Sequence, residues 1–311
     1  MTEGAGAFPG STVFPGSTEA EIASQPDCWR RAAALSAGLA GGPLPAPGER
    51  VAVAGCGTSW FVAQSYAAAR EAAGHGETDA FAASEMPAGR RYDRVVALSR
   101  SGTTTEILDL LARLAGTAPT VAITAAGAMP VARAADAVIV LDFADEQSVV
   151  QTRFATTELA LLLASLGQDI EPMAAAASAV LAADLPAELL AAEQFTFLGS
   201  GWTCGLASEA ALKLREAAGA WTEAYPAMEY RHGPIAVAGP GRVVWLLGPA
   251  PDGLTDDVAL AGGLVWQPPA AIETPLAELV RVQRVAAAIA RARGLDPDRP
   301  RHLTRSVILS G

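Results

Sequence analysis

The feature that most constrains the fold is an alternation of short apolar runs with longer helix-like segments, beginning at Val51. Each run has only four or five residues and is too short for a helix, whereas the segments between the runs have helical length. Parallel strands need such crossover segments, so the pattern predicts a parallel sheet with helices on both faces. The predicted strands are residues 51–54, 79–83, 95–98, 120–124 and 138–141.

The second half of the chain begins in the same way as the first. A strand at 195–198 leads into the sequence GSGWTCG, which is similar to GCGTSW after the first strand. A helix at 206–218 and a strand at 242–247 follow, but 252–265 is too short for a complete further helix and strand. We therefore interpret the chain as two copies of one α/β fold, with the second lobe trimmed.

Helices and linkers complete the predicted organisation. We expect helices at 19–25, at 28–40 with Asp27 as its cap, at 147–166, at 174–192 and at 275–292. The first residues contain FPGST twice, which is low-complexity sequence typical of a mobile arm. The predicted division is a flexible arm at 1–18, a first domain at 19–170, a connecting helix at 171–193 and a second domain with a tail at 194–311.

Composition excludes several classes of partner. The net charge of -11 argues against a nucleic-acid surface and against binding to anionic membranes. No apolar run reaches the ~18 residues of a membrane span, and the start of the chain does not resemble a signal peptide. The scattered cysteines Cys28, Cys56 and Cys204 favour a reducing cytoplasm. We expect neither a metal site nor a cofactor.

Two Gly-containing turns that follow predicted strands carry hydroxyl side chains and open helices. Helix N-termini offer free N–H groups and partial positive charge, which suits a phosphate. The first turn carries Thr58 and Ser59, and residues 99–105 supply five hydroxyls, among them Ser99, Ser101 and Thr104. The alternative is that these residues only cap helices, but a cap needs one hydroxyl. The turns therefore predict a phosphate site.

Glu209, Lys213 and Glu216 fall at i, i+4 and i+7, so they share one face of a predicted helix. Lys213 is the only lysine in the chain, and arginine cannot replace an amine that must lose its proton. The segment ends in EYRHGP, which places His232 on a Gly-Pro turn. This combination is typical of proton transfer, although a solvated ion-pair ladder is the alternative.

The motifs GCGTS, SRSGTTTE, ALKLREAAGAWTEAY, EYRHGP and PRHLTRSV occur in this order. Together they resemble the SIS (sugar isomerase) domain family. The similarity is greatest to the isomerase half of glucosamine-6-phosphate synthase and to amino-sugar-phosphate deaminase/isomerases without a glutaminase domain. The resemblance extends from about Glu19 to the C-terminus. It implies two SIS domains, each a parallel sheet flanked by helices in a three-layer sandwich, and a homodimer with shared active sites.

The resemblance also implies a set of site residues. Glu216 would be the base that moves a proton between C1 and C2, with Lys213 beside it, and His232 would assist ring opening from the neighbouring subunit. The residues implied to bind the sugar phosphate are Cys56, Gly57, Thr58, Ser59, Ser99, Arg100, Ser101, Thr104, Val149, Gln151 and Arg305.

Some positions depart from the family pattern. We expect no glutaminase domain, so glutamine would not be the source of ammonia. Arg100 stands at a usual glutamine and would add charge beside the phosphate. Arg305 stands where the synthase has a lysine, and arginine cannot form a Schiff base. In the same tail, His302 either helps to close the site or lies on the surface.

The leading functional hypothesis is an isomerase and deaminase acting on a 6-phosphorylated amino sugar, of the glucosamine- or galactosamine-6-phosphate type, to give a ketose 6-phosphate and ammonia. A second hypothesis is a deglycase of a 6-phosphorylated fructosamine–amino acid. A third is a sugar-phosphate sensor without catalysis, which would be expected to lack Glu216 or His232.

Overall fold

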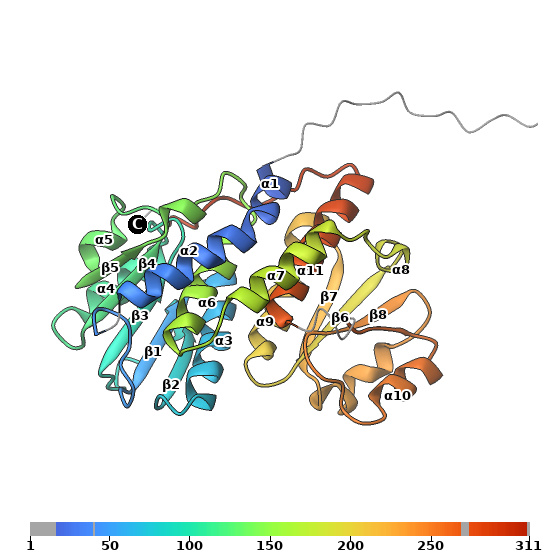
Figure 1. The fold of residues 1–311 in the computed structure, drawn as a ribbon, viewed down its shortest axis with the longest axis horizontal. Coiled ribbons are helices and arrows are strands. Elements are labelled where there is room, and N and C mark those ends of the chain that lie inside the picture. The colour runs from blue at the N-terminus through green and yellow to red at the C-terminus, as the bar shows by residue number, and fades with distance from the viewer. Residues whose placement is uncertain (1–16, 40, 269–273, 310–311) are drawn as a thin grey trace, which may run out of the picture.

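A computed structural model describes residues 17–39, 41–268 and 274–309, and its strands form two parallel sheets (Figure 1). The first sheet has five strands in the order β2-β1-β3-β4-β5, and every neighbouring pair is parallel. This confirms the α/β class and the five strands predicted for the first half. The strands are β1 (Val51–Gly55), β2 (Thr78–Ala82), β3 (Arg94–Leu98), β4 (Thr120–Thr124) and β5 (Ala137–Val140).

Helices cover both faces of the first sheet because successive strand residues point to opposite sides. Val51 and Val53 belong to the core shared with α2, α3 and α6, whereas Ala52 and Ala54 pack in a separate cluster with α4. The helical elements of this half are α1 (Ser17–Ala23), α2 (Gln25–Gly38), α3 (Thr58–Ala72), η1 (Ala83–Glu85), α4 (Thr105–Leu114), α5 (Val131–Ala134), η2 (Asp142–Ala144) and α6 (Arg153–Ser165).

The second sheet has four parallel strands in the order β7-β6-β8-β9. Its inner face joins the shared core and its outer face packs against α10. The strands are β6 (Gln194–Gly199), β7 (Trp221–Pro226), β8 (Arg242–Leu246) and β9 (Leu264–Trp266). The helical elements are α7 (Glu171–Ala182), α8 (Ala187–Leu190), α9 (Thr203–Ala218), η3 (Glu229–Arg231), η4 (Pro234–Val237), α10 (Leu254–Leu260) and α11 (Pro275–Ala292).

Several expected boundaries are wrong, each for an identifiable reason. The helix expected at 147–166 begins only at Arg153, because the carboxylate of Glu21 accepts the Gln147 and Ser148 N–H groups and Glu146 accepts those of Thr152 and Arg153. The single helix expected at 174–192 is two helices, α7 and α8. The backbone becomes extended at Ala183, which ends α7, and Pro186 immediately precedes α8.

At the N-terminus, residues 1–16 lie outside the described part of the chain, so most of the FPGST repeat and of the expected arm does too. Ser17 and Thr18 begin α1 and are anchored by hydrogen bonds to Asp298. Asp27 lies inside the first turn of α2 instead of capping it.

The second lobe is less trimmed than the sequence predicted. Residues 252–265, judged too short for a further helix and strand, form α10 and begin β9. Strand β7, which pairs with β6 from Trp221 to Pro226, was not predicted either. The second sheet nevertheless has one strand fewer than the first.

The turns after β1 and β6 have the same geometry. Gly57 and Gly201 have φ values of 54° and 56°, a region that favours glycine. A Cβ added to Gly55 would lie 2.5 Å from the Ser59 carbonyl oxygen, and one added to Gly199 would lie 2.3 Å from that of Thr203. The GCGTSW and GSGWTCG similarity is therefore a repeated strand–turn–helix structure.

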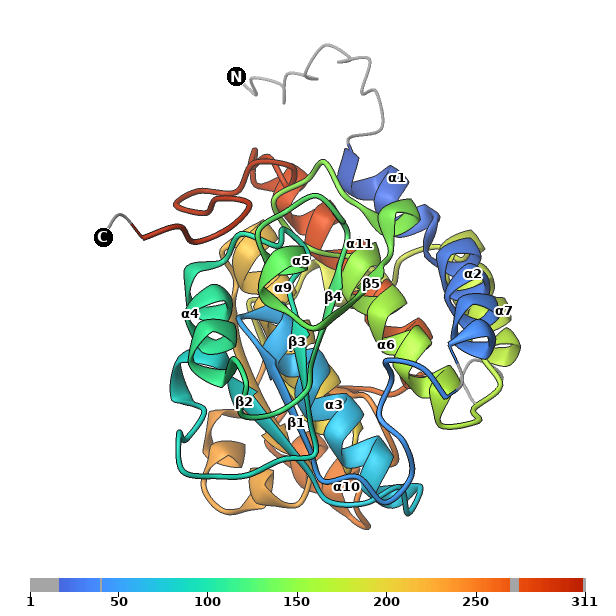
Figure 2. The same ribbon diagram turned by 90° about the vertical axis from the view of Figure 1, so that its left-hand side faces the viewer.

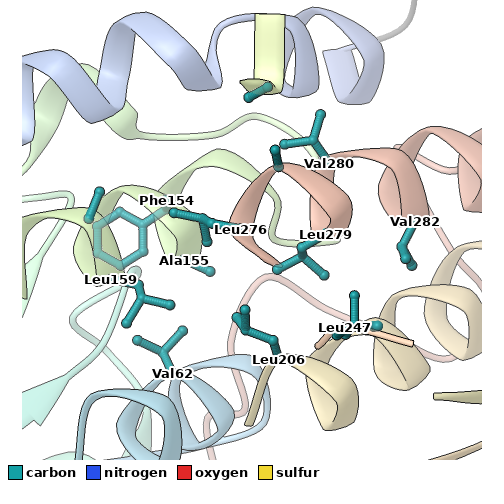
Figure 3. Packing of buried hydrophobic residues seen from close by; sticks show 14 of the residues in the cluster. Val62, Phe154, Ala155, Leu159, Leu206, Leu247, Leu276, Leu279, Val280 and Val282 are labelled. Atoms are coloured by element: carbon teal, nitrogen blue, oxygen red, sulfur yellow. The ribbon is translucent and has the colours of Figure 1, made fainter. Parts of the chain in front are cut away.

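A single apolar core lies between the two sheets. Figure 3 shows Val62 of α3, Leu159 of α6, Leu206 of α9 and Leu279 of α11 converging there, and all four are buried. Helices α3 and α9 approach so closely at Gly205 that an added Cβ would lie 2.4 Å from the Phe61 carbonyl oxygen. This packing fixes α9, which carries the acid–base stripe, against the helix that follows the first hydroxyl turn.

The C-terminal tail returns from the second half to the first. After α11 the chain runs back across the molecule toward the first half, and its last described residue, Leu309, donates a backbone hydrogen bond to Thr105 at the start of α4 (Figures 1 and 2). It is held there by a hydrogen bond of 2.9 Å between the Thr103 and Ser306 hydroxyls, and the Thr105 N–H donates to the Val307 carbonyl. The tail therefore lies over the second hydroxyl turn.

Candidate functional site

Lys213 connects the acid–base helix to the first hydroxyl turn. Its Nζ donates to Thr58 Oγ1 at 3.0 Å, is hydrogen-bonded to Glu216 and lies 3.4 Å from Glu209 Oε1. Side-chain exposure is 1% for Lys213 and Glu209 and 20% for Glu216. The structure thus brings together the three charged residues of the predicted stripe. Because two of them are buried, the stripe is not the solvated ladder that was the alternative.

Burial and charge pairing shift the pKa values of Glu209 and Lys213 in opposite directions. Burial raises the pKa of Glu209 to about 7, while the Lys213 ammonium partly offsets that rise. For Lys213 burial disfavours the charged form, but Glu209 and Glu216 outweigh it and the pKa of Lys213 is raised. Lys213 is therefore an ammonium at neutral pH, a donor that fixes Glu216 and Thr58.

The hydroxyls of the two turns are not used as helix caps. Neither α3 nor α4 has a side-chain cap hydrogen bond, although Thr104 occupies the N-cap position of α4. Ser101 instead accepts from the Thr103 N–H and hydroxyl and lies 3.5 Å from Thr104 Oγ1. Ser101 and Thr104 thus lie together at the N-terminus of α4, an end of a helix that favours an anion, although the Thr105 N–H there already donates to the tail.

Ser59, Cys56 and Gly57 complete the first turn. Ser59 is buried in the first turn of α3, and Gly57 supplies the positive φ that lets this helix start. Burial raises the pKa of Cys56 to about 11, so this side chain is a neutral thiol. It can contribute a weak donor but not a thiolate nucleophile.

Arg100 is buried and its charge is already paired. Its guanidinium lies 3.1 Å from Glu146 Oε2 and donates to the carbonyl oxygens of Ser148 and Val149. The predicted extra charge beside the phosphate is thus balanced in this structure by Glu146. Arg100 also donates to the Arg305 carbonyl at 3.3 Å, which ties the turn to the tail.

The remaining predicted binding residues lie along the loop before α6 and in the tail. The Val149 N–H donates to the Asp298 carbonyl at 3.0 Å. Gln151 Oε1 is buried and has no hydrogen-bond partner among the described residues, so its capacity to accept a hydrogen bond is unused. The Arg305 side chain pairs with Asp145 and the Glu146 carbonyl and so fastens the tail to this loop.

His232 does not share a cavity with Glu216 within one chain. It follows η3, its side chain is exposed, and it does not line the cavity that reaches Glu216. That cavity, of about 440 Å³, is bounded by the end of α9 and by residues 294–302. The structure of a single chain therefore leaves the predicted role of His232 dependent on a second subunit.

Glu158 on α6 is a buried acid that was not predicted from the sequence. Its side chain is fully buried, and neither carboxyl oxygen makes a well-formed hydrogen bond with a described residue. Burial raises the pKa of Glu158 well above its usual range, Glu209 and Glu146 add to the rise, and Ser59 opposes it. A lone acid in the apolar run FATTELALLLA was the signal that could have found it.

Neither a metal-binding group nor a membrane-spanning helix occurs among the described residues. In the described ranges, no group of three His, Cys, Asp or Glu residues could hold a metal ion. None of the helices seen in residues 17–39, 41–268 and 274–309 has the length and apolarity needed to cross a membrane.

The fold and the site together define a class of α/β protein with parallel sheets. In this class, as seen here for Lys213 and Glu216, a lysine–glutamate pair contacts a hydroxyl-rich turn at the carboxyl end of a strand. Open α/β sheets bind ligands at this position. Residues 46–166 match the model of the SIS domain. The chain therefore contains a SIS domain, and the family resemblance drawn from its motifs is confirmed.

Similar curated proteins carry one recurrent name. The chain is 36% identical over 150 residues to a glutamine–fructose-6-phosphate aminotransferase (isomerizing) of Gloeobacter violaceus, covering 40% of this chain and 25% of that protein. It is 28% identical over 296 residues to the protein of the same name from Sulfurisphaera tokodaii, covering 83% of this chain and 50% of that protein. The chain thus spans a quarter to a half of these relatives.

Solved structures share the fold over almost the whole chain. A glucosamine-6-phosphate deaminase from Thermotoga maritima has a TM-score of 0.77 and 24% identity, covering 94% of this chain and all of that one. The C-terminal domain of glucosamine-fructose-6-phosphate aminotransferase from Francisella tularensis has the same TM-score and 21% identity, again covering 94% and 100%. At these identities the similarity establishes the fold.

Proposed function

We propose that this protein isomerises a 6-phosphorylated 2-amino sugar and releases ammonia, leaving a ketose 6-phosphate. The observation that carries the proposal is Lys213, which contacts both Glu216 and Thr58. This contact joins a carboxylate suited to proton transfer with a turn suited to phosphate. The names of the relatives and of the Thermotoga maritima structure support an amino-sugar phosphate as the substrate class.

In the proposed mechanism, Glu216 removes the C2 proton of the open-chain amino aldose while O1 gains a proton, which gives an enolamine. The proton is then returned from Glu216 to C1 as the amino group loses one of its own protons. The product is a 2-imine, and water replaces its nitrogen to give the ketose and ammonia. Lys213 orients Glu216 and offsets charge that develops on the substrate. The phosphate is assigned to Ser99, Ser101, Thr104, Thr58 and Ser59, with Cys56, Gly57, Arg100, Val149, Gln151 and Arg305 around the sugar.

We further infer that residues 194–309 form a second SIS domain and that the protein is a homodimer. The order β7-β6-β8-β9 matches β2-β1-β3-β4, and the turns after β1 and β6 are alike. The exposed His232 would then enter the pocket of the neighbouring subunit. Mixing Glu216→Gln with His232→Ala protein tests this, because each heterodimer would regain one complete site. If verified heterodimers stay inactive, His232 does not act between subunits.

The overall activity is tested with a panel of phosphorylated substrates. Ammonia, free amino acid and ketose 6-phosphate are measured with glucosamine 6-phosphate, galactosamine 6-phosphate and 6-phosphorylated fructosamine–amino acids. We expect ammonia and ketose 6-phosphate from at least one amino-sugar phosphate. Release of an amino acid instead would identify a deglycase, and tight binding without turnover would identify a sensor. Either result would overturn the proposal.

A further inference from the structure

The cavity that reaches Glu216 is also lined by a histidine of the same chain, His302, which is exposed at the surface. Glu216, from the last turn of α9, and His302, from the tail, both line this space of about 440 Å³. Arg215, Arg299 and Arg301 also line it, so an anionic ligand would meet favourable charge there. The cavity thus combines a carboxylate already assigned to proton transfer with an imidazole that no role above uses.

The backbone holds His302 in an unusual conformation. Its φ is +64°, and it is the one non-glycine residue with a positive φ in the part of the chain that the structure describes. Such conformations cost free energy and persist where the surrounding structure imposes them. Histidine tolerates this left-handed region better than most residues, and asparagine tolerates it equally well. Asparagine at this position would therefore keep the backbone while removing the imidazole.

Anchors on both sides of His302 fix the tail in place. Before it, Asp298 accepts hydrogen bonds from Thr18 and its carbonyl accepts the Val149 N–H. After it, Arg305 pairs with Asp145, and Ser306 bonds to Thr103. His302 is therefore presented by a segment that is attached to the loop before α6 and to the second hydroxyl turn.

The other two histidines are placed differently. His75 lies between Gly74 and Gly76 in the loop after α3, and His232 lies beyond η3, where it is exposed to solvent, as His302 is. Neither lines the Glu216 cavity. Within one subunit, His302 is thus the imidazole that borders the space beside the proposed base.

We propose that His302 is a second catalytic proton-transfer group, which opens the sugar ring at the Glu216 site of its own subunit; this rests on the proposed function. His302 takes the O1–H proton as the C1–O5 bond breaks and the C1 carbonyl forms. The electron pair of that bond goes to O5, which receives a proton from the second acid–base group, assigned above to His232. An imidazole can take or give a proton near neutral pH, as this step requires.

The test compares a closed-ring substrate with one that cannot form a five- or six-membered ring. His302→Asn and a matched control, His75→Asn, are assayed with glucosamine 6-phosphate and with its 4,5-dideoxy analogue, which lacks both hydroxyls that could close such a ring on C1. We expect His302→Asn to lose about 10²- to 10³-fold in kcat on the closed-ring substrate. On the 4,5-dideoxy analogue it should stay within about threefold of the parent, and His75→Asn should match the parent on both.

Two results would overturn the assignment while leaving the proposed function intact. One is a His302→Asn variant that retains activity on glucosamine 6-phosphate within about threefold. The other is an equal loss on both substrates, which would place His302 in a step other than ring opening. A parent protein inactive on both substrates would instead overturn the proposed function, and this inference with it. Binding of 2-amino-2-deoxyglucitol 6-phosphate, an open-chain non-substrate, confirms that the site of His302→Asn is intact.

Discussion

The two halves of the molecule share a strand–turn–helix structure but carry different side chains at the equivalent strand ends. After β1 the turn leads into Thr58 and Ser59, and the loop after β3 adds more hydroxyls; the residues after β8 are Leu247, Gly248, Pro249 and Ala250. Backbone geometry is thus common to both halves, but the second half has fewer hydroxyls: Ser200 and Thr203 follow β6, and the Thr203 hydroxyl already accepts the Ser200 N–H within its own turn. The second half supplies α9, whose Lys213 and Glu216 reach the first half's turn.

The comparison suits the proposed function, in which the two halves have different roles. We assign substrate binding to the first half and proton transfer to the second, and the contact between α3 and α9 brings the two together. Gly205 permits that contact, because a side chain there would collide with α3. Four changes test the comparison, in order of decreasing expected effect.

Glu216→Gln tests whether the second half supplies the base. The amide keeps the shape of the side chain but cannot accept a proton, so turnover should fall by about 10²- to 10⁴-fold. Binding of a sugar phosphate should change little, because the hydroxyl turns are untouched. Steady-state kinetics and calorimetric titration separate the two effects, and near-normal turnover would remove Glu216 from the mechanism.

Ser101→Ala combined with Thr104→Ala tests whether the first half binds the phosphate. Loss of two hydrogen bonds to a charged group should weaken binding of a sugar phosphate by about 10²- to 10³-fold. Ser200→Ala, in the exposed part of the turn after β6, is the matched control and should bind as the parent does. Equal affinity of the parent for glucosamine and for its 6-phosphate would contradict the assignment.

Gly55→Ala and Gly199→Ala test the structural equivalence of the two turns. In each case the new Cβ would overlap a backbone carbonyl four residues ahead, so each should reduce the free energy of unfolding by about 1–3 kcal/mol. Gly38→Ala, with nothing within 4 Å of its Cβ, should be neutral or slightly stabilising. Denaturant unfolding measures all three, and tolerance of alanine at only one turn would break the equivalence.

Glu158→Gln tests the buried acid beside Ser59. Because its folded-state pKa is raised, the folded protein binds more protons than the unfolded chain, and stability falls as pH rises above the ordinary value of 4.5. Each tenfold difference in proton affinity between the folded and unfolded states changes the free energy of unfolding by about 1.4 kcal/mol. The variant should lose less unfolding free energy than the parent between pH 5 and pH 8.

Glu188→Gln, at an exposed position on α8, is the control and should follow the parent. Identical pH profiles for the parent and Glu158→Gln would contradict this account.

Much of the fold follows from the sequence because the first half obeys simple periodicity. The strand at 120–124 and the helix at 275–292 have the predicted bounds. Strand β7 was missed because it is an edge strand in which Thr222 and Glu223 interrupt the apolar pattern and Pro226 ends it. The loop at 147–152 resembled a helix, since only the carboxylates of Glu21 and Glu146, distant in sequence or outside the segment, hold it in another conformation.

The grouping of the three charged residues on α9 was predictable from the sequence, whereas other contacts of the candidate site were not. Helical spacing alone placed Lys213 with Glu209 and Glu216 on one face. The pairing of Arg100 with Glu146 and the position of His302 beside Glu216 depend on chain segments that meet only in the folded protein. No local pattern encodes such contacts.

The central claim is that Glu216 moves a proton on a sugar whose phosphate is held by the first half. Solvent exchange tests it most directly, by incubation in D₂O and NMR detection of deuterium at C1 and C2. We predict that the parent protein incorporates deuterium into glucosamine 6-phosphate, that Glu216→Gln does so at least about 10²-fold more slowly, and that unphosphorylated glucosamine is not labelled. Equal labelling by the parent and Glu216→Gln, or equal labelling of the two sugars, would contradict the account.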